Sequence, residues 1–339
     1  MNALFRCDAT HETGFGHLSR CIALAEALRL SNTNSIFVGK FDQAACDQLA
    51  ASGFGSVNLP VPVNTDTSPR ELAETLASHG ADFIVLDSYR ADERYLYDLA
   101  SLGPSIVAID DFRALSDYPC DVVLNFTWEA PSLDYPEGPV LLLGPQFLLA
   151  RRNLVEHRAR SIERDRRGPV RNLLIAIGGT DPKGIATRLI RILHELHSGL
   201  CVRVIAQSTC EIAAMMERFS PDSLVLPRQP DLSEQLMWAD AAITGGGLIK
   251  YESAYMAAPA AAISQNEGQD GETQVLSRAG LVFDLGLADS VSDNELANAL
   301  DRFISNAEMR STMTSRMRET FVSDPTANAA NAILEAVRR

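Results

Sequence analysis

The stretch that decides the fold is LFRCDATHETGFGHLSRCIALAEALRL, residues 4–30. Its first residues form a short apolar run that predicts a strand over 4–7, and its last residues carry apolar side chains at helical spacing that predict a helix over 16–30. The loop between them contains Gly14 and Gly16, which allow positive φ angles and close approach of the backbone to a ligand. A strand, a glycine loop and a helix in this order predict an α/β unit that binds its ligand at the carboxyl end of the strand.

The same alternation of apolar strand and helix runs through the rest of the chain. A helix predicted over 42–52 has Asp42 as its N-cap. The further strands that we predict are 35–38, 83–87, 105–109, 122–124 and 140–143 in the first half, and 172–177, 202–206, 224–226, 241–244, 260–263 and 281–283 in the second. Continuous apolar strands separated by helices predict buried parallel sheets.

An arginine-rich segment interrupts this alternation over 146–171. A solvated helix and linker is the favoured interpretation, and a binding patch is the alternative. We place the domain boundary in this segment, which gives an N-terminal domain over 1–150, a nucleotide-binding domain over 168–325 and a C-terminal helix over 326–339 that can pack back on the N-terminal domain. The predicted fold class is α/β, with two doubly wound Rossmann-like domains facing across a cleft.

The composition argues against several classes of protein. A net charge of −14 disfavours broad binding of nucleic acids or insertion at anionic membranes, but a local cluster of backbone N–H groups can still bind a small anion. The six cysteines form no CxxC pair and no His/Cys cluster with zinc spacing, so we expect neither a metal nor a cofactor. We see no signal peptide and no apolar run that suits a membrane span, and we expect a cytoplasmic location. The oligomeric state stays open.

His17 stands in the first turn of the helix predicted over 16–30. The dipole and free N–H groups of a helix N-terminus favour an anion and disfavour an imidazolium, so we expect His17 to be neutral near pH 7 and able to act as a base. A purely structural histidine is the alternative. Asp87 and the pair Asp110-Asp111 end other strands of this half, and we expect them at the same edge of the sheet.

A run of glycines, Gly245-Gly246-Gly247, follows a predicted strand and precedes a helix. Such a loop lets the backbone touch a diphosphate that faces the helix N-terminus. Glu252 lies farther along that helix, where its carboxylate can accept bonds from both ribose hydroxyls. The alternative is a tight turn followed by a solvated glutamate. We favour the binding site, because consecutive glycines cost stability unless something needs the space.

Two more polar loops follow strands of the second half. Gly178 and Gly179 open a turn whose backbone can line the binding site, and Asp181 is expected to cap the next helix, from Lys183. Asn266 and Gln269 belong to a later loop, where amides can bind sugar or phosphate oxygens. A plain surface loop is an equally good interpretation of this last segment.

Taken in order, these motifs resemble those of a known family. They are RCDA and GFGHLSRC, the strand ends LDSY and AIDDF, the boundary segment LLGPQFLLAR, and then IAIGGTDP, ADAAITGGG and NEGQ. They are similar to segments of the UDP-2,4-diacetamido-2,4,6-trideoxy-beta-L-altropyranose hydrolases of pseudaminic acid biosynthesis and of the related predicted glycosyltransferases of spore-coat polysaccharide synthesis. The resemblance covers nearly the whole chain. It implies the GT-B fold, similar in architecture to the N-acetylglucosamine transferase of peptidoglycan lipid II synthesis.

Carried over position by position, the resemblance implies roles for individual residues. His17 would be the catalytic base for an attacking water, with Asp8 next in line, and both Asp8 and Tyr89 would lie near the sugar. The glycine run would face the diphosphate and Glu252 the ribose. The residues that we predict to bind the substrate are Gly14, Gly16, Arg20, Tyr89, Gly178, Gly179, Gly245, Gly246, Gly247, Leu248, Lys250, Glu252, Asn266 and Gln269.

The leading hypothesis is hydrolysis of a UDP-linked deoxy amino sugar at its anomeric carbon, in nonulosonic acid or surface glycan biosynthesis. The chain differs from the hydrolases at Leu248 and Ile249, where they commonly carry hydroxyl side chains, and at Ser88, where they tend to carry histidine. These differences keep a second hypothesis open, a GT-B glycosyltransferase that moves the sugar of a UDP- or CMP-sugar to a glycan or protein acceptor. A nucleotide-sugar binder without turnover is the third. In each case the expected partner is a small-molecule nucleotide sugar.

Overall fold

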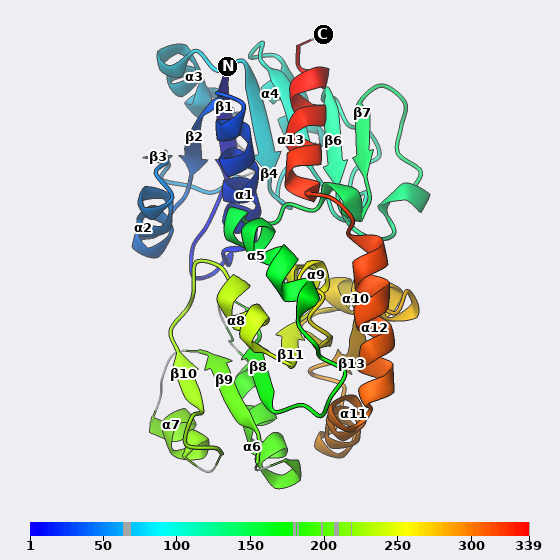
Figure 1. Cartoon of the computed structure of the whole chain (residues 1–339). Helices are drawn as coiled ribbons and strands as arrows, with labels where there is room; N and C mark the ends of the chain where they lie inside the picture. The colour runs from blue at the N-terminus through cyan, green and yellow to red at the C-terminus, as the bar shows by residue number, and fades with distance from the viewer. Residues whose placement is uncertain are drawn as a thin grey trace. The chain divides into compact units, whose positions relative to one another are not determined.

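The computed structural model describes residues 1–63, 69–178, 181, 183–197, 199–206, 210–217 and 219–338. The chain divides into two compact units. The first is made of Met1–Arg152 with Ser323–Arg339, and the second is made of Asn153–Val322. Each unit has its own parallel sheet with helices around it (Figure 1).

The sheet of the first unit has seven strands, which pair in parallel in the order β3-β2-β1-β4-β5-β6-β7. Its strands are β1 (Asn2–Cys7), β2 (Asn34–Gly39), β3 (Gly55–Asn58), β4 (Phe83–Asp87), β5 (Ser105–Ile109), β6 (Val122–Asn125) and β7 (Val140–Leu143). Its helices are α1 (Gly16–Leu30), α2 (Gln43–Ala51), α3 (Ala73–His79), α4 (Glu93–Ala100) and α13 (Pro325–Ala336), with the short 3-10 helices η1 (Pro69–Leu72), η2 (Ala130–Ser132) and η3 (Pro145–Phe147). The last helix, α13, packs beside α1 although the two lie at opposite ends of the sequence (Figure 1).

The sheet of the second unit has six strands, which pair in parallel in the order β10-β9-β8-β11-β12-β13. Its strands are β8 (Asn172–Ala176), β9 (Cys201–Ile205), β10 (Leu224–Leu226), β11 (Ala241–Gly245), β12 (Ala260–Ser264) and β13 (Phe283–Leu287). Its helices are α5 (Arg152–Glu163), which starts at the last residue of the preceding unit, and α6 (Ile185–Leu196), α7 (Cys210–Met216), α8 (Ser233–Trp238), α9 (Leu248–Tyr255), α10 (Glu267–Arg278), α11 (Asp293–Ser305) and α12 (Ala307–Thr320).

In both sheets the strand order reverses beside the first strand of the unit. β1 lies between β2 and β4, and β8 lies between β9 and β11. Open parallel sheets bind ligands outside the carboxyl ends of the strands at such a reversal, so the loops after β1, β4, β8 and β11 are the expected binding loops. The prediction of two doubly wound Rossmann-like sheets is confirmed.

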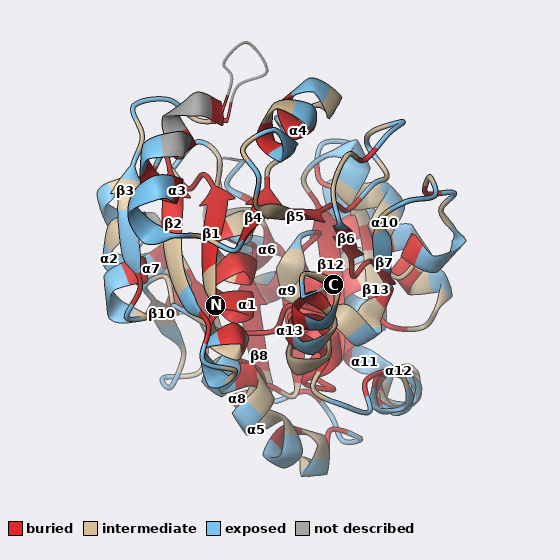
Figure 2. Cartoon of the chain, turned by 90° about the horizontal axis from the view of Figure 1, so that it is seen from above, coloured by how far each residue is buried: buried red, intermediate tan, exposed pale blue. Residues whose placement is uncertain are grey.

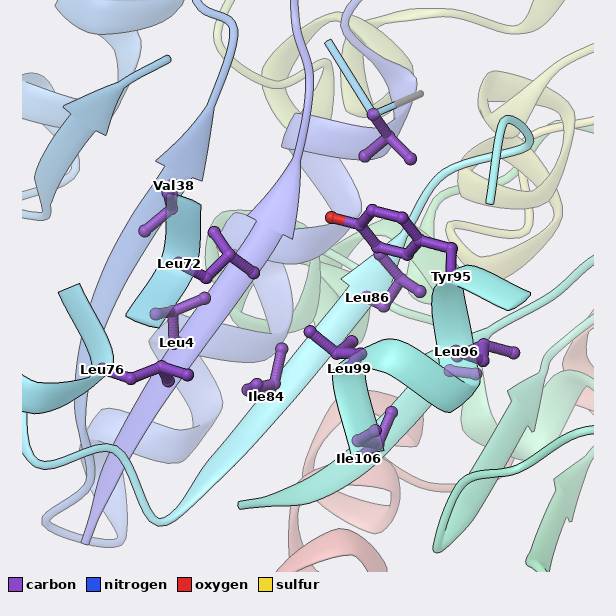
Figure 3. Close-up of a cluster of buried hydrophobic side chains, with 12 residues drawn as sticks. Leu4, Val38, Leu72, Leu76, Ile84, Leu86, Tyr95, Leu96, Leu99 and Ile106 are labelled. Carbon is purple, nitrogen blue, oxygen red and sulfur yellow. The ribbon is translucent and has the colours of Figure 1, made fainter. Parts of the chain in front are cut away.

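Buried aliphatic side chains fill the space between sheet and helices. The central strands β4 and β11 are buried along their whole length, and Figure 2 shows the middle of the first sheet in red. Figure 3 shows one cluster of the first unit, in which Leu4 of β1 and Ile84 of β4 lie with Leu76 of α3 and Leu99 of α4. Because helices cover these strands, their sequences are continuous apolar runs rather than alternating ones.

Two strands of the structure differ from the sequence prediction. β3 was not predicted, because most of its residues are exposed at the edge of the sheet and they form no apolar run. The last strand was predicted at 281–283, whereas β13 covers Phe283–Leu287. Leu281 and Val282 are buried in the loop before the strand, and Asp284 and Gly286 interrupt the apolar pattern of the strand itself.

The ends of helices follow from local hydrogen bonds. The predicted N-cap is confirmed at Asp42, whose carboxylate accepts a bond from the backbone N–H of Ala45 at 2.9 Å. The helix predicted from Lys183 begins at Ile185, with Gly184 at the N-cap position. Asp181 accepts bonds from the N–H groups of Ile185 at 2.9 Å and Ala186 at 2.7 Å, so its carboxylate satisfies the first donors of α6 as predicted. Among the helices in the described ranges, none is long and apolar enough to cross a membrane.

The arginine-rich segment is more than a solvated linker. The Arg166 side chain is buried and donates to the carbonyl oxygens of Ser161 at 2.6 Å, Leu236 at 3.0 Å and Ala239 at 3.0 Å. These carbonyls stand at the C-terminal ends of α5 and α8, where backbone acceptors have no partner within their own helix. The interpretation of the whole segment as solvated is therefore wrong at Arg166, which ties two helix ends together.

We expect Arg166→Met to lower the free energy of unfolding by about 3 kcal/mol, because it leaves buried carbonyl oxygens without donors. The matched control is Arg167→Met, since that neighbouring side chain is 77% exposed and is ion-paired with Asp165. We expect the control to change stability by less than about 0.5 kcal/mol. Urea denaturation of the three proteins measures the difference, and equal midpoints for the two variants would contradict the capping role.

Candidate functional site

The loop after β1 is a tight turn that leads directly into α1. The backbone N–H of Gly14 donates to the carbonyl of Thr10 at 2.9 Å, and the φ angle of Gly14 is 77°, which favours glycine. A Cβ atom added at Gly14 or at Gly16 would meet no other atom within 4 Å. The space around both glycines is therefore open, and Gly16 is the first residue of α1.

His17 forms a hydrogen bond with the carboxylate at the end of β4. Its Nδ1 atom lies 2.6 Å from Oδ1 of Asp87, whose side chain is completely buried. Burial acts to raise the pKa of Asp87, but the charge of Arg20 and the hydrogen bonds from Arg20 and His17 outweigh it and hold that pKa well below its usual range. A carboxylate can only accept, so Nδ1 carries the proton and the lone pair of a neutral ring is on Nε2. Within the described part of the chain, Nε2 has no hydrogen-bond partner.

Arg20 joins two carboxylates from neighbouring strand ends. Its Nε and Nη2 atoms each donate to Asp87 at 2.6 Å, and its Nη1 atom lies 2.8 Å from both oxygens of Asp111. Burial lowers the pKa of Arg20, but Asp111 and Asp87 outweigh it and raise that pKa well above its usual value. The sequence predicted a ligand contact for Arg20. In the structure the N–H groups of the Arg20 guanidinium donate to Asp87 and Asp111. A hydrogen bond between Arg20 and a substrate stays a prediction.

Tyr89 stands next to His17 at the same edge of the sheet. The two rings meet edge to face, with centroids 4.5 Å apart, and the Tyr89 hydroxyl donates to Asp111. The ring of Phe112 lies 5.6 Å from that of Tyr89, and both aromatic side chains are exposed. The residues predicted here as base and as sugar contact thus lie side by side.

The carboxylate of Asp8 is hydrogen-bonded to other groups of the protein. Its two oxygens accept bonds from Nη1 of Arg6 at 2.7 Å, from the N–H of Lys40 at 2.9 Å and from the N–H of Val63 at 2.7 Å. Asp8 is buried, and these bonds tie β1 to the segments after β2 and β3. The geometry favours a structural role, and the catalytic role predicted from the sequence stays untested.

The glycine run after β11 divides into packed and open positions. A Cβ atom at Gly245 would lie 2.0 Å from the carbonyl oxygen of Ile177, and one at Gly246 would lie 2.9 Å from Oγ of Ser264. The nearest atom to a Cβ at Gly247 is Nε2 of Gln269, at 3.9 Å. The first two glycines are thus required by the packing of the protein on itself. Only Gly247, at the N-cap of α9, leaves room for a ligand.

Lys250 is buried beneath this loop. Its Nζ atom donates to the carbonyl of Gly246 at 2.5 Å, to Glu272 at 2.8 Å and to Oγ1 of Thr273 at 3.3 Å. Since α9 begins at Leu248, Glu252 lies in its second turn, where it is also buried. Lys250 therefore fixes the position of the Gly246 carbonyl in the loop. The contact of Lys250 with a diphosphate stays a prediction.

The remaining predicted residues follow β8 and β12, and Gln269, which was predicted in a loop, lies in the first turn of α10 because Asn266 caps that helix. Gly178 has a φ angle of 142°, and Gly179 lies outside the described residues. Asn266 caps α10 by accepting a bond from the N–H of Gln269 at 3.0 Å, and Oε1 of Gln269 accepts a bond from the N–H of Gln265 at 3.0 Å. These amides order the loop beside Gly247, and direct contact with a ligand is untested.

The sequence did not predict that Asp87 and Asp111 would bind His17 and Arg20. The available signal was their position at strand ends beside the reversal in the first sheet. Among the described residues, no group of at least three His, Cys, Asp and Glu side chains is arranged to hold a metal ion. The expected independence from metals remains a prediction.

We expect a pH-dependent difference in stability between the wild type and Asp87→Asn. The folded-state pKa of Asp87 is lowered, so its stabilising contribution is present above the unfolded pKa of about 4 and is lost as the pH falls toward the folded value. Urea denaturation at a series of pH values should show the difference in unfolding free energy narrowing below about pH 4. A difference that stays constant with pH would show that Asp87 is not held as a buried carboxylate.

Comparisons with known proteins give distant relatives. No family model matches the chain. It is 22% identical over 274 residues to the uncharacterized protein MJ1062 of Methanocaldococcus jannaschii, covering 77% of this chain and 55% of that protein, so it spans about half of that relative. It is 23% identical over 319 residues to the spore coat polysaccharide biosynthesis protein SpsG of Bacillus subtilis, covering 89% of each. It is 25% identical over 227 residues to the UDP-2,4-diacetamido-2,4,6-trideoxy-beta-L-altropyranose hydrolase of Campylobacter jejuni, covering 65% of this chain and 74% of that one.

Several solved structures that are similar to this chain in fold are glycosyltransferases. MurG of Acinetobacter baumannii has a TM-score of 0.68 at 15% identity and covers 99% of this chain and 100% of its own. SnogD of Streptomyces nogalater has a TM-score of 0.65 at 17% identity, with 99% of each chain covered. VinC, solved in complex with dTDP, has a TM-score of 0.66 at 12% identity, with 100% of each chain covered. The chain has the two-domain GT-B fold that these glycosyltransferases share.

Proposed function

We propose that this protein hydrolyses a UDP-linked deoxy amino sugar at its anomeric carbon and releases UDP. The observation that carries the proposal is the hydrogen bond between His17 and the buried Asp87, formed at the strand reversal of the first sheet. It orients an imidazole whose Nε2 can accept a proton beside an open loop. The GT-B fold and the UDP-sugar hydrolase among the distant relatives support a nucleotide sugar as the substrate.

In the proposed reaction a water molecule attacks C1 of the sugar. As the new C1–O bond forms, Nε2 of His17 takes a proton from the water, and the bond between C1 and the diphosphate oxygen breaks with its electron pair going to UDP. Asp87 stabilises the imidazolium that results, because its carboxylate already accepts the Nδ1 proton. Base catalysis of this kind contributes roughly 10²–10⁴-fold to the rate.

The second unit supplies the proposed nucleotide site. The open position at Gly247 and the first N–H groups of α9 suit the negative charge of a diphosphate, and Lys250 holds the Gly246 carbonyl away from it. Glu252 is proposed to accept bonds from the ribose. Backbone donors and the helix dipole thereby stabilise the leaving UDP, and we propose that no metal or cofactor takes part.

Transfer to an acceptor is the second candidate. It is favoured by the apolar residues Leu248 and Ile249 after the glycine loop, by the glycosyltransferases that share the fold and by the relative named for spore coat polysaccharide biosynthesis. Incubation with a panel of UDP- and CMP-sugars, with and without glycan acceptors, separates the two. Nucleotide released without an acceptor supports hydrolysis, release only with an acceptor supports transfer, and binding without release contradicts both.

His17→Asn should preserve UDP binding and lower kcat by about 10²-fold or more, because it removes the base and leaves the second unit intact. The acidic limb of the pH–rate profile should disappear with it. His11→Asn is the matched control, since His11 is an exposed residue of the same loop, and it should turn over normally. Normal turnover by His17→Asn would place the base elsewhere.

Gly247→Ala should fold normally and bind UDP about tenfold more weakly, because its Cβ would occupy the space proposed for the diphosphate. Calorimetric titration measures the affinity, and thermal unfolding measures the fold. Gly245→Ala is the contrasting variant, since its Cβ would collide with the Ile177 carbonyl and should destabilise the protein itself. UDP affinity that is unchanged in Gly247→Ala would move the diphosphate site away from this loop.

A further inference from the structure

A cluster of three buried charged side chains contacts His17. The guanidinium of Arg20 binds Asp87 through Nε and Nη2, and it binds both oxygens of Asp111 through Nη1. The side chains of these residues are at most 8% exposed. Asp87 ends β4, Asp111 follows β5 and Arg20 lies on α1, so the cluster links three segments of the first unit.

We propose that Arg20 and Asp111 are positioning residues for His17, which they control without touching the substrate. They hold the imidazole in the form that has its proton on Nδ1, and they leave a surplus negative charge that favours protonation of the ring. This inference rests on the proposed role of His17 as the base. It replaces the substrate contact that the sequence predicted for Arg20 with a positioning role, and it adds Asp111, to which nothing above gives a part in the reaction.

The first part of the inference concerns which nitrogen atom of the neutral His17 ring carries the proton. Nη2 of Arg20 lies 3.2 Å from Nδ1 of His17, near enough to donate a hydrogen bond to it. Such a bond needs a lone pair on Nδ1 and would move the proton of a neutral ring to Nε2, where it would block the base. In the structure Asp87 is the closer partner of Nδ1, at 2.6 Å against 3.2 Å for Nη2, and the two bonds of Asp111 to Nη1 hold the guanidinium in that position.

The second part follows from the charges around the ring. Two carboxylates face one guanidinium, so the cluster keeps one negative charge until His17 takes a proton. Among the described residues, the other titratable side chains that contact the two carboxylates are Tyr89 and Cys21, and the dipole of the α1 N-terminus beside His17 acts against this negative charge. The Tyr89 hydroxyl donates to Asp111, and Cys21, whose thiol lies 3.5 Å from Asp87, has a pKa that burial raises well above its usual value. Replacing Asp111 by a neutral residue should therefore remove this net negative charge and make protonation of His17 less favourable.

The test is NMR of the full-length protein with ¹⁵N-labelled histidine, without any substrate. In the wild type the neutral His17 ring should carry its proton on Nδ1. In Asp111→Asn the pH midpoint of the His17 signals should fall by about one unit, and part of the neutral ring should carry its proton on Nε2. The His17→Asn spectrum assigns the signals, and the signals of His11 in the same samples serve as the internal control.

If the pH midpoint of the His17 signals in Asp111→Asn is unchanged or higher, the negative charge of Asp111 does not favour protonation of His17. If the neutral His17 ring of this variant still carries its proton only on Nδ1, Asp111 does not determine which nitrogen atom is protonated. If Asp111→Asn does not fold, Asp111→Ser removes the same charge with a smaller side chain, and the same outcomes apply. The spectra need no turnover. If they change as expected while no nucleotide sugar is cleaved, the proposed function fails and the positioning role of Arg20 and Asp111 stands.

Discussion

The buried contact between Arg20 and its two carboxylates organises the edge of the first sheet at which His17 lies. Taking a guanidinium and two carboxylates out of water is costly unless each charge finds a close partner, and here every one of them does. The pairing is possible because the strand order puts β4 beside β1 and β5 beside β4. His17 depends on this arrangement for its orientation, since the carboxylate that binds its Nδ1 atom is the one that Arg20 holds.

The second unit reaches a comparable result by packing rather than by charge pairing. Gly245 and Gly246 let the loop after β11 press against Ile177 and Ser264, and Lys250 draws the Gly246 carbonyl inward. What remains facing outward is Gly247 and the N-terminal end of α9, which attract negative charge.

Much of this fold could be predicted from the sequence, because strands buried on both faces are continuous apolar runs and helix caps such as Asp42 have local signals. The exposed edge strand β3 lacked that pattern and was missed. His17 and the glycine run could be recognised from their places after strands. The partners of His17 could not, because a bond between residues 17 and 87 depends on strand order and side-chain direction. For the same reason the sequence suggested ligand contacts for Arg20 and Lys250, whose donors are bound inside the protein.

The central claim is that water attacks the anomeric carbon under base catalysis by His17. Turnover of the accepted UDP-sugar in ¹⁸O-labelled water, followed by mass spectrometry of both products, tests it most directly. The account predicts that the label appears in the free sugar and not in UDP, and that labelled sugar no longer forms at a measurable rate in His17→Asn. Label in the phosphate of UDP would show that a phosphorus–oxygen bond is broken instead. Release of UDP only when an acceptor is added would contradict hydrolysis and make the protein a transferase.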